Sequence, residues 1–182
     1  MMPRYRYWTA TTLDGFLADE QDSLDWLFVQ EQDDAPGTPG RYDDFIAGVG
    51  AVVMGATTYA WLVHHLKESG EAWPYTQPCL VFTHRTFEAP GDDITFVSGP
   101  PARHRTALER AAGNRDVWVV GGGALAADFA GAGMLDEVLV SIAPVTLGAG
   151  RPLFPRPFDL RLRDVGRNGA FVVASYDVVG AR

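Results

Sequence analysis

Residues 117–129, Val-Trp-Val-Val-Gly-Gly-Gly-Ala-Leu-Ala-Ala-Asp-Phe, constrain the fold of this chain more than any other stretch. Four apolar residues, three of them β-branched, predict a strand buried on both faces. Three glycines end that strand, and the alanine-rich run after them predicts an amphipathic helix. Such a turn lets a ligand approach the backbone, and the helix start offers free N–H groups to an anion. The same glycines also suit a tight turn that only lets the helix pack closely on the strand. Other parts of the chain must decide between a ligand site and a purely structural turn.

Length and composition predict one globular domain, residues 1–182, of which 47% are hydrophobic and 21% charged. The net charge of −8 argues against a nucleic-acid partner or an anionic membrane surface. The single cysteine, Cys79, excludes an internal disulfide, and the adjacent His64 and His65 point apart on a helix, so no metal site is expected. The start of the chain does not resemble a signal peptide, and no apolar run approaches the ~20 residues that span a bilayer. We therefore expect a cytoplasmic protein.

Strands and helices alternate along the chain until its last third. Besides 117–120, strands are predicted over 4–12, 51–54, 78–83, 93–97 and 137–142, and helices over 41–49, 57–67, 102–112 and 123–131. The polar segment 19–40 is long for a loop, which is typical of a lid or a binding segment. Two closing strands, 160–165 and 170–178, flank Asn168-Gly169, a strong hairpin signal. This pattern predicts the α/β class: a three-layer α/β/α sandwich with a mostly parallel central sheet and an antiparallel C-terminal hairpin.

Three strand-to-helix or strand-to-loop turns carry groups that suit an anion. Besides the glycine triplet, Gly55 precedes Thr57 and Thr58, and the strand over 78–83 is followed by His84 and Arg85. Each has a simpler explanation, since capping accounts for the threonines and solvent exposure for the arginine. Together they suit an extended phosphorylated ligand such as a dinucleotide, because ligands bind at the carboxyl ends of strands in open α/β sheets. Neither G-x-G-x-x-G nor a P-loop motif is present, which disfavours a Rossmann domain and a phosphotransferase.

Several short segments carry a resemblance to a known family. They are, in chain order, 12–18 with 24–27, 53–59, 119–123, 135–137, and 144–150 followed by Leu153-Phe154. Through them nearly the whole chain resembles the dihydrofolate reductase-like superfamily. The resemblance is strongest to the branch shared by the reductase domain of bifunctional riboflavin-biosynthesis enzymes and small stand-alone reductase-like proteins. The order and spacing of these segments are specific for the superfamily and much less so for a substrate.

The resemblance implies that NADPH lies across the carboxyl ends of the sheet. Arg85 would pair with its 2′-phosphate. Folate reductases often carry a basic residue directly after the first glycine turn, where this chain has Ala56. The expected preference for NADPH over NADH therefore rests on Arg85 alone. The implied contacts are Gly55, Thr57 and Thr58 with Gly121, Gly122, Gly123, Ala124 and Leu125 at the pyrophosphate, Thr83, His84 and Arg85 at the adenosine ribose, and Ala10 and Leu17 at the nicotinamide.

Asp14 is the predicted proton donor. Hydride addition leaves negative charge on the acceptor heteroatom, so a proton source is required. Burial of Asp14 beneath the 19–40 loop would raise its pKa toward neutral. The alternative is that Asp14-Gly15 merely forms a turn.

Four other side chains are predicted to contact substrate. Folate reductases use a carboxylate from their first helix, and Asp43 and Asp44 lie in the corresponding region, although both also suit solvated or capping positions. Trp26 would form either a flat wall for a heterocycle or a cover over the core edge. Thr12, on the first strand with Thr9 and Thr11, would donate a hydrogen bond.

The predicted function is an NADPH-dependent reductase that transfers a hydride to a C=N or C=O bond of a small, planar heterocyclic substrate. The alternatives are a non-catalytic nucleotide-binding or sensor protein, a structural protein that has lost the cofactor, and a protein that binds a flavin or deazaflavin instead. A homodimer is expected to pair through residues 170–179, because a bare apolar edge strand invites aggregation unless it is covered.

Overall fold

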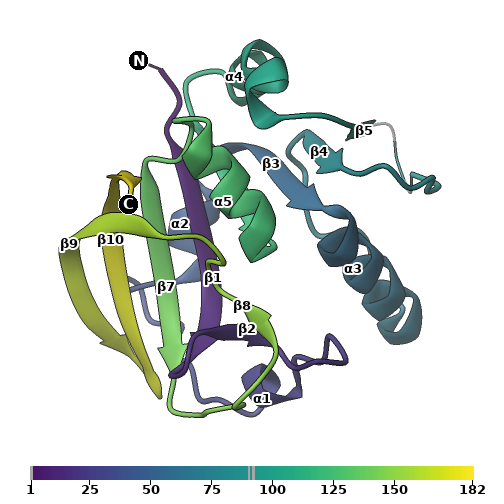
Figure 1. The fold of residues 1–182 in the computed structure, drawn as a ribbon. Helices are drawn as coiled ribbons and strands as arrows, with labels where there is room; N and C mark the ends of the chain where they lie inside the picture. Colours follow the sequence, from purple (N-terminus) through teal and green to yellow (C-terminus); the bar gives the residue numbers. More distant parts are fainter. Residues whose placement is uncertain (1, 90, 92) are drawn as a thin grey trace.

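The computed structural model describes residues 2–89, 91 and 93–182. Its main sheet consists of β1 (Tyr5–Thr12), β3 (Val49–Gly55), β4 (Cys79–Phe82), β5 (Ile94–Val97), β6 (Asp116–Gly121), β7 (Glu137–Ala143), β9 (Phe158–Asn168) and β10 (Phe171–Ala181). These eight strands have the spatial order β5-β4-β3-β6-β1-β7-β10-β9 (Figure 1). The first six are mutually parallel, whereas β10 runs antiparallel to both β7 and β9.

Helices cover both faces of this sheet. They are α1 (Asp25–Phe28), α2 (Tyr42–Ile46), α3 (Ala56–Ser69), the 3-10 turn η1 (Pro101–His104), α4 (Arg105–Ala112) and α5 (Gly123–Gly131). Alternate residues of β3 point to opposite faces: Val53 packs in the cluster that holds Leu108 of α4 and Phe129 of α5. Met54 packs in the cluster that holds Tyr59 of α3. The predicted three-layer arrangement with a mostly parallel sheet is therefore confirmed. In the described part of the chain, no helix combines the length and apolar character needed to cross a membrane.

The C-terminal hairpin is present but larger than predicted. Both strands have 11 residues, and the turn is Gly169-Ala170, where Gly169 adopts φ +56°. The expectation that the last strand forms the sheet edge was wrong, because β10 lies between β7 and β9. The outer strand β9 carries charged side chains such as Arg161 and Arg163 between its apolar residues, a composition that suits an exposed edge.

Two loops that appeared irregular in the sequence form a small second sheet. Strand β2 (Phe16–Ala18) pairs antiparallel with β8 (Arg151–Pro152). Gly150 makes this contact possible, since a Cβ at that position would lie 2.1 Å from the Ala18 carbonyl oxygen. The loop over 19–40 is held at its far end by buried Asn168, which accepts a hydrogen bond from the Asp33 amide at 2.7 Å and donates one to the Pro39 carbonyl at 3.1 Å.

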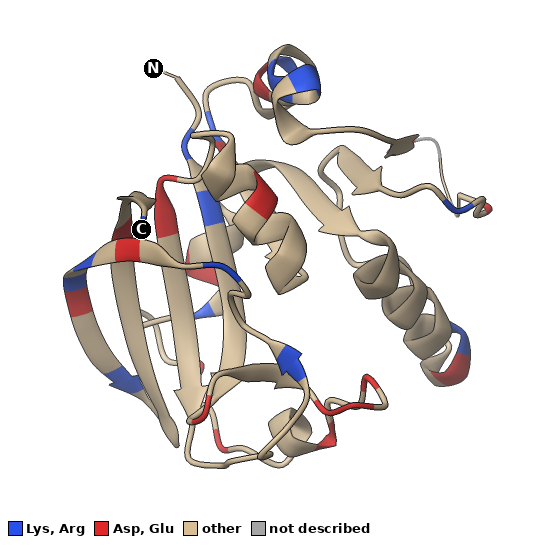
Figure 2. Ribbon diagram, in the orientation of Figure 1, with Lys and Arg blue, Asp and Glu red and all other residues tan. Residues whose placement is uncertain are grey.

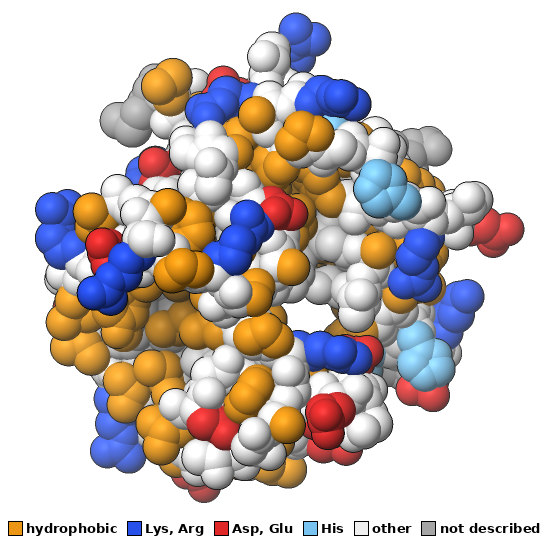
Figure 3. Space-filling view, viewed as in Figure 1, with side chains coloured by type: hydrophobic (Ala, Val, Ile, Leu, Met, Phe, Trp, Pro, Cys, Tyr) orange, Lys and Arg blue, Asp and Glu red, His pale blue; other side chains and the backbone are white. Residues whose placement is uncertain are grey.

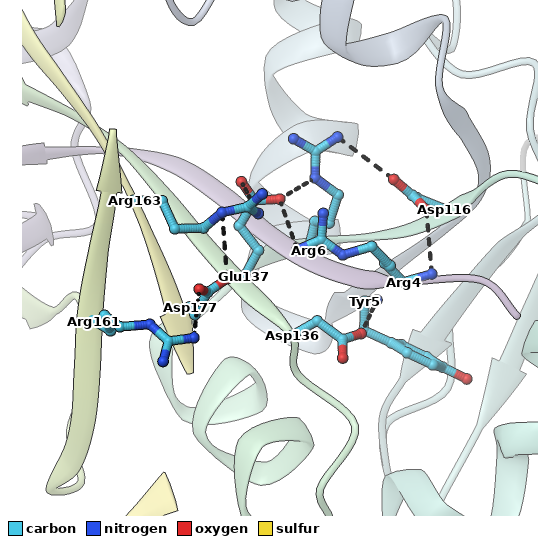
Figure 4. A network of polar contacts seen from close by, with 9 residues as sticks. All are labelled: Arg4, Tyr5, Arg6, Asp116, Asp136, Glu137, Arg161, Arg163 and Asp177. Atoms are coloured by element: carbon cyan, nitrogen blue, oxygen red, sulfur yellow. Dashed lines mark hydrogen bonds and ion pairs between the residues drawn. The ribbon is translucent and has the colours of Figure 1, made fainter. Parts of the chain in front are cut away.

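A polar network lies at the amino ends of β1, β6 and β7 (Figure 4). Its centre is Glu137, whose side chain is only 6% exposed and lies 2.6 Å from Arg6 Nε. Arg4 and Arg163 each lie 3.6 Å from the same carboxylate. Asp116 provides Arg6 with a second partner. The network lies at the end of the strands opposite to their carboxyl termini, so we assign it a structural role, in which loss of one partner would leave an uncompensated buried charge.

Candidate active site

The carboxyl ends of β1 and β6 and the starts of α3 and α5 border a cavity of about 610 Å³. The surface is hollowed near the middle of the view in Figure 3. The described residues that line the cavity are Thr9, Ala10, Leu17, Ala18, Asp22, Leu24, Leu27, Thr57, Thr58, Trp61, Leu62, Tyr75, Val120, Gly121, Gly122, Gly123, Ala124, Arg151, Pro152 and Pro155. Figure 2 shows that the ribbon around it is mostly uncharged, with β8 and the loop before α1 as the exceptions.

Two helix starts open onto this region without side-chain caps. Gly55 and Gly122 are the N-cap residues of α3 and α5, and neither can supply a side-chain acceptor. Neither helix has an acidic residue in its first turn. The N–H groups of the two first turns and the positive ends of both helix dipoles are therefore available to an anion.

A second cavity, of about 230 Å³, lies at the ends of β3 and β4 and includes Gly55, Thr83, His84 and Leu125. Of the thirteen positions predicted for the cofactor, eight line the larger cavity, these four line the smaller one, and Arg85 lines neither.

Arginines near the smaller cavity differ in how they are held. The Arg85 guanidinium lies over the Phe87 ring, 4.7 Å from its centroid. Arg103 lies beside Gly99, which lines the cavity: a Cβ on Gly99 would be 3.2 Å from Arg103 Nη1. Arg103 was not among the residues predicted for the cofactor, because its position depends on how the chain folds back after β5.

Asp14 is not placed as a proton donor. Its side chain is exposed and lies outside both cavities, so the expectation that the 19–40 loop buries it and raises its pKa was wrong. The hydrogen bond from Thr12 Oγ1 at 2.6 Å, with those from the amides of Gly148 and Leu147, lowers the pKa of Asp14 below its usual value. The carboxylate is therefore ionised at neutral pH and ties the turn after β1 to the loop after β7.

Three predicted substrate contacts also lie away from the cavities. Trp26 is 8% exposed and packs in a cluster with Phe171 and Val173, so it covers the edge of the core. Asp43 and Asp44 are exposed and pair with Arg41 at 2.6 and 3.0 Å, which matches the alternative of solvated residues near a helix start.

The three threonines of β1 also have different roles: two hold a turn and one lines the larger cavity. Thr12 is buried and accepts a hydrogen bond from the Phe16 amide at 3.0 Å, and Thr11 is buried and donates to the Phe16 carbonyl at 3.1 Å. Both therefore hold the turn into β2. Only Thr9 lines the larger cavity.

Apolar residues at the other end of the larger cavity were missed. Trp61 and Leu62 line it one helical turn after Thr57 and Thr58. Spacing by four residues places such pairs on one helix face, so this signal was available in the sequence. Tyr75 gave no comparable signal, because it lies in the loop after α3.

Few titratable groups line the larger cavity. Burial raises the pKa of Tyr75 far above its ordinary value, so this phenol stays protonated. Asp22 is the single carboxylate among the described lining residues, and it lies 2.6 Å from Arg151 Nε. The described carboxylate of this cavity is therefore held in an ion pair.

The fold is that of dihydrofolate reductase-like proteins. Dihydrofolate reductase from Enterococcus faecalis, solved with NADP(H), has the same fold, with a TM-score of 0.59 at 11% identity over 96% of both chains. The model of the RibD C-terminal domain matches residues 5–168, and the chain belongs to that family.

Two further proteins cover almost the full length of this chain. The uncharacterized protein YwjB of Bacillus subtilis (strain 168) is 33% identical over 171 residues, which are 92% of this chain and 93% of that protein. A putative riboflavin biosynthesis protein from Shewanella sp. PV-4 has a TM-score of 0.79 at 23% identity, with 98% of this chain and 99% of that chain covered. The branch of the superfamily expected from the sequence is therefore confirmed.

Proposed function

We propose that this protein is an NADPH-dependent reductase that acts on a C=N or C=O bond of a small, planar heterocycle. The observation that carries the proposal is that two uncapped helix starts, at Gly55 and Gly122, lie beside cavities whose far end is apolar. The starts of α3 and α5 would hold the pyrophosphate, Thr83 and His84 the adenosine end, and Ala10 and Leu17 the nicotinamide. The bound nicotinamide would supply the hydride, while the chain supplies orientation and excludes water.

The acceptor gains a hydride at carbon and a proton at its heteroatom. We propose water as the proton source, because the described carboxylate in the cavity, Asp22, is engaged by Arg151. Tyr75 would donate a hydrogen bond to the heteroatom without losing its proton, since its raised pKa makes it a poor acid.

Titration with NADPH and NADH while protein melting is followed tests the cofactor site. A ligand specific for the native state at a hundred times its Kd stabilises a protein by about 2.7 kcal/mol, and a chain of this size gains about 2–4 °C in Tm per kcal/mol. We therefore expect saturating NADPH to raise Tm by about 5–10 °C. Unchanged melting with both coenzymes would contradict the proposal.

A second candidate is a protein that binds the nucleotide without turnover. The lack of a free acid among the described cavity residues favours it. It predicts the same rise in Tm but no oxidation of NADPH with any acceptor in a broad panel, so one additional assay separates the two.

Preference for NADPH over NADH is proposed to depend on Arg103 more than on Arg85. Arg103 borders Gly99 in the smaller cavity, whereas the Arg85 guanidinium is engaged by Phe87. Loss of one charge-assisted hydrogen bond weakens binding by about 1.5–3 kcal/mol, roughly tenfold or more. We expect Arg103→Ala to reduce the NADPH-to-NADH affinity ratio by about tenfold and Arg85→Ala to reduce it by less, as measured by nicotinamide fluorescence. The opposite ranking would return the role to Arg85.

Homodimerisation remains a proposal. The apolar side chains of Leu162 on β9 and Val172 on β10 are 56% and 49% exposed, and Leu160, Val165 and Val179 of the same hairpin are also exposed. We propose this exposed face of the hairpin as the contact between two copies, in place of the edge that β10 was expected to form.

A further inference from the structure

The two ends of the larger cavity have different chemistry. The helix starts and Gly121–Gly123 form one end, where N–H groups can meet the negative charge of a coenzyme. The other end is formed mainly by Leu24, Leu27, Trp61, Leu62 and Tyr75, with the Thr9 hydroxyl beside them. This second end, which we call the acceptor end, offers aliphatic and aromatic surfaces and neutral hydroxyl groups.

Contacts between elements hold the acceptor end together. Trp61 of α3 stacks on Phe28 of α1 with a centroid distance of 6.3 Å and an interplanar angle of 20°. His65 lies 4.9 Å from Trp61 and 5.9 Å from Phe28, nearly parallel to both rings. On the other side, Tyr75 packs edge-on against Trp118 at 5.6 Å. The segment that carries Leu24 and Leu27 is thereby fixed against α3.

Charged groups around the cavity are already paired. Among its described lining residues only Asp22 and Arg151 carry charge. Arg151 Nε lies 2.6 Å from Asp22, and Arg151 Nη2 donates to the Glu20 carbonyl at 3.1 Å and contacts the second Asp22 oxygen at 3.3 Å. A phosphate or carboxylate on a substrate that enters the acceptor end would find no free cation among the described lining residues, and burial of an unpaired ion is strongly unfavourable.

We propose that the acceptor is an uncharged, flat ring that carries a C=O or C=N group and neither phosphate nor carboxylate. This inference rests on the proposed reductase function and specifies its substrate class. Trp61 and Tyr75 would contact the ring, and the Tyr75 hydroxyl is a neutral donor for its heteroatom, whereas the Thr9 hydroxyl already donates to the Ala10 carbonyl at 3.2 Å. Reduction adds a hydride from the coenzyme to the carbon and a proton from water to the heteroatom, and the coenzyme leaves oxidised.

Matched acceptors test this inference directly. The full-length protein, with and without saturating NADP⁺, would be titrated with isatin and isatin-5-sulfonate and with 1,4-naphthoquinone and its 2-sulfonate, while tryptophan fluorescence is followed. We expect each neutral compound to bind at least tenfold more tightly than its sulfonate. Equal or tighter binding of the sulfonates, or no binding of either neutral compound, would overturn the inference.

A cation introduced at the acceptor end is expected to change this preference. Leu27→Arg places an unpaired guanidinium beside the cavity, so sulfonate affinity should rise about tenfold. Leu24→Arg repeats the test at a second lining position in case the first variant does not fold. Leu13→Arg is the matched control, because Leu13 is 69% exposed and outside both cavities. A gain in sulfonate binding with Leu13→Arg equal to that of the cavity variants would contradict the assignment.

Coenzyme binding separates the two levels of the proposal. Tight binding of NADPH together with a preference for sulfonated acceptors would overturn the substrate class alone. Failure of NADPH and NADH to bind would overturn the proposed function, while the titrations without coenzyme would still show whether the acceptor end prefers neutral rings.

Discussion

Replacement of Thr57 by aspartate is expected to abolish coenzyme binding while the fold keeps its stability. Thr57 is exposed, lines the larger cavity and is the second residue of α3, whose first turn has no acidic residue. A carboxylate there interacts favourably with the helix dipole and stabilises the fold by about 0.3–1 kcal/mol. The same charge would repel a pyrophosphate, so we expect NADPH affinity to fall at least a hundredfold in a fluorescence titration, with Tm unchanged or slightly higher.

Thr106→Asp is the matched control for this variant. Thr106 is also exposed, also the second residue of a helix whose first turn lacks an acid, and outside both cavities. It should give the same small change in Tm and leave NADPH affinity within about twofold. Undiminished affinity in Thr57→Asp would mean that the start of α3 does not hold the pyrophosphate.

Local patterns in the sequence are enough to bring most residues predicted for the cofactor to one edge of the sheet. Gly55 and Gly121–Gly123 each lie where an apolar strand ends and a helix begins, so chain connectivity alone places them at one edge of a parallel sheet. The same argument placed Thr83 and His84 after β4. What these residues bind remains a prediction, but their convergence on two cavities follows from features only a few residues long.

The substrate side depends on contacts between distant segments, which a single sequence does not reveal. Asp14 is held by the amides of Leu147 and Gly148, more than 130 residues away along the chain. Trp26 is buried by residues of β10, which form the far end of the chain. In both cases the residue type allowed a functional and a structural interpretation, and long-range packing decided for the structural one.

Replacement of Gly123 by alanine is expected to lower the free energy of unfolding more than the same replacement at Gly55. A Cβ at Gly123 would lie 2.3 Å from the Pro152 carbonyl oxygen and 2.5 Å from that of Leu153. That segment cannot easily move, because the buried Tyr7 hydroxyl donates to the Leu153 carbonyl at 3.0 Å and the Leu153 amide donates to the Gly15 carbonyl at 2.9 Å. Overpacking of this kind destabilises by about 3 kcal/mol, a loss of about 6–12 °C in Tm.

Gly55→Ala is the control that separates the effect of the contact with the Pro152 and Leu153 carbonyl groups from that of a methyl group at a helix start. Gly55 also stands at the start of a helix below the sheet edge, with φ −85°, and a Cβ there would have its nearest neighbours at 3.8 Å. The added methyl group should therefore change the free energy of unfolding by less than about 1 kcal/mol, because an alanine also restricts the unfolded chain. If both variants lost equal stability, the loss would come from any side chain at a helix start. If only Gly123→Ala lowers Tm, the third glycine of the triplet serves packing between α5 and the segment that begins with β8. Contact with the coenzyme would then be left to Gly121 and Gly122.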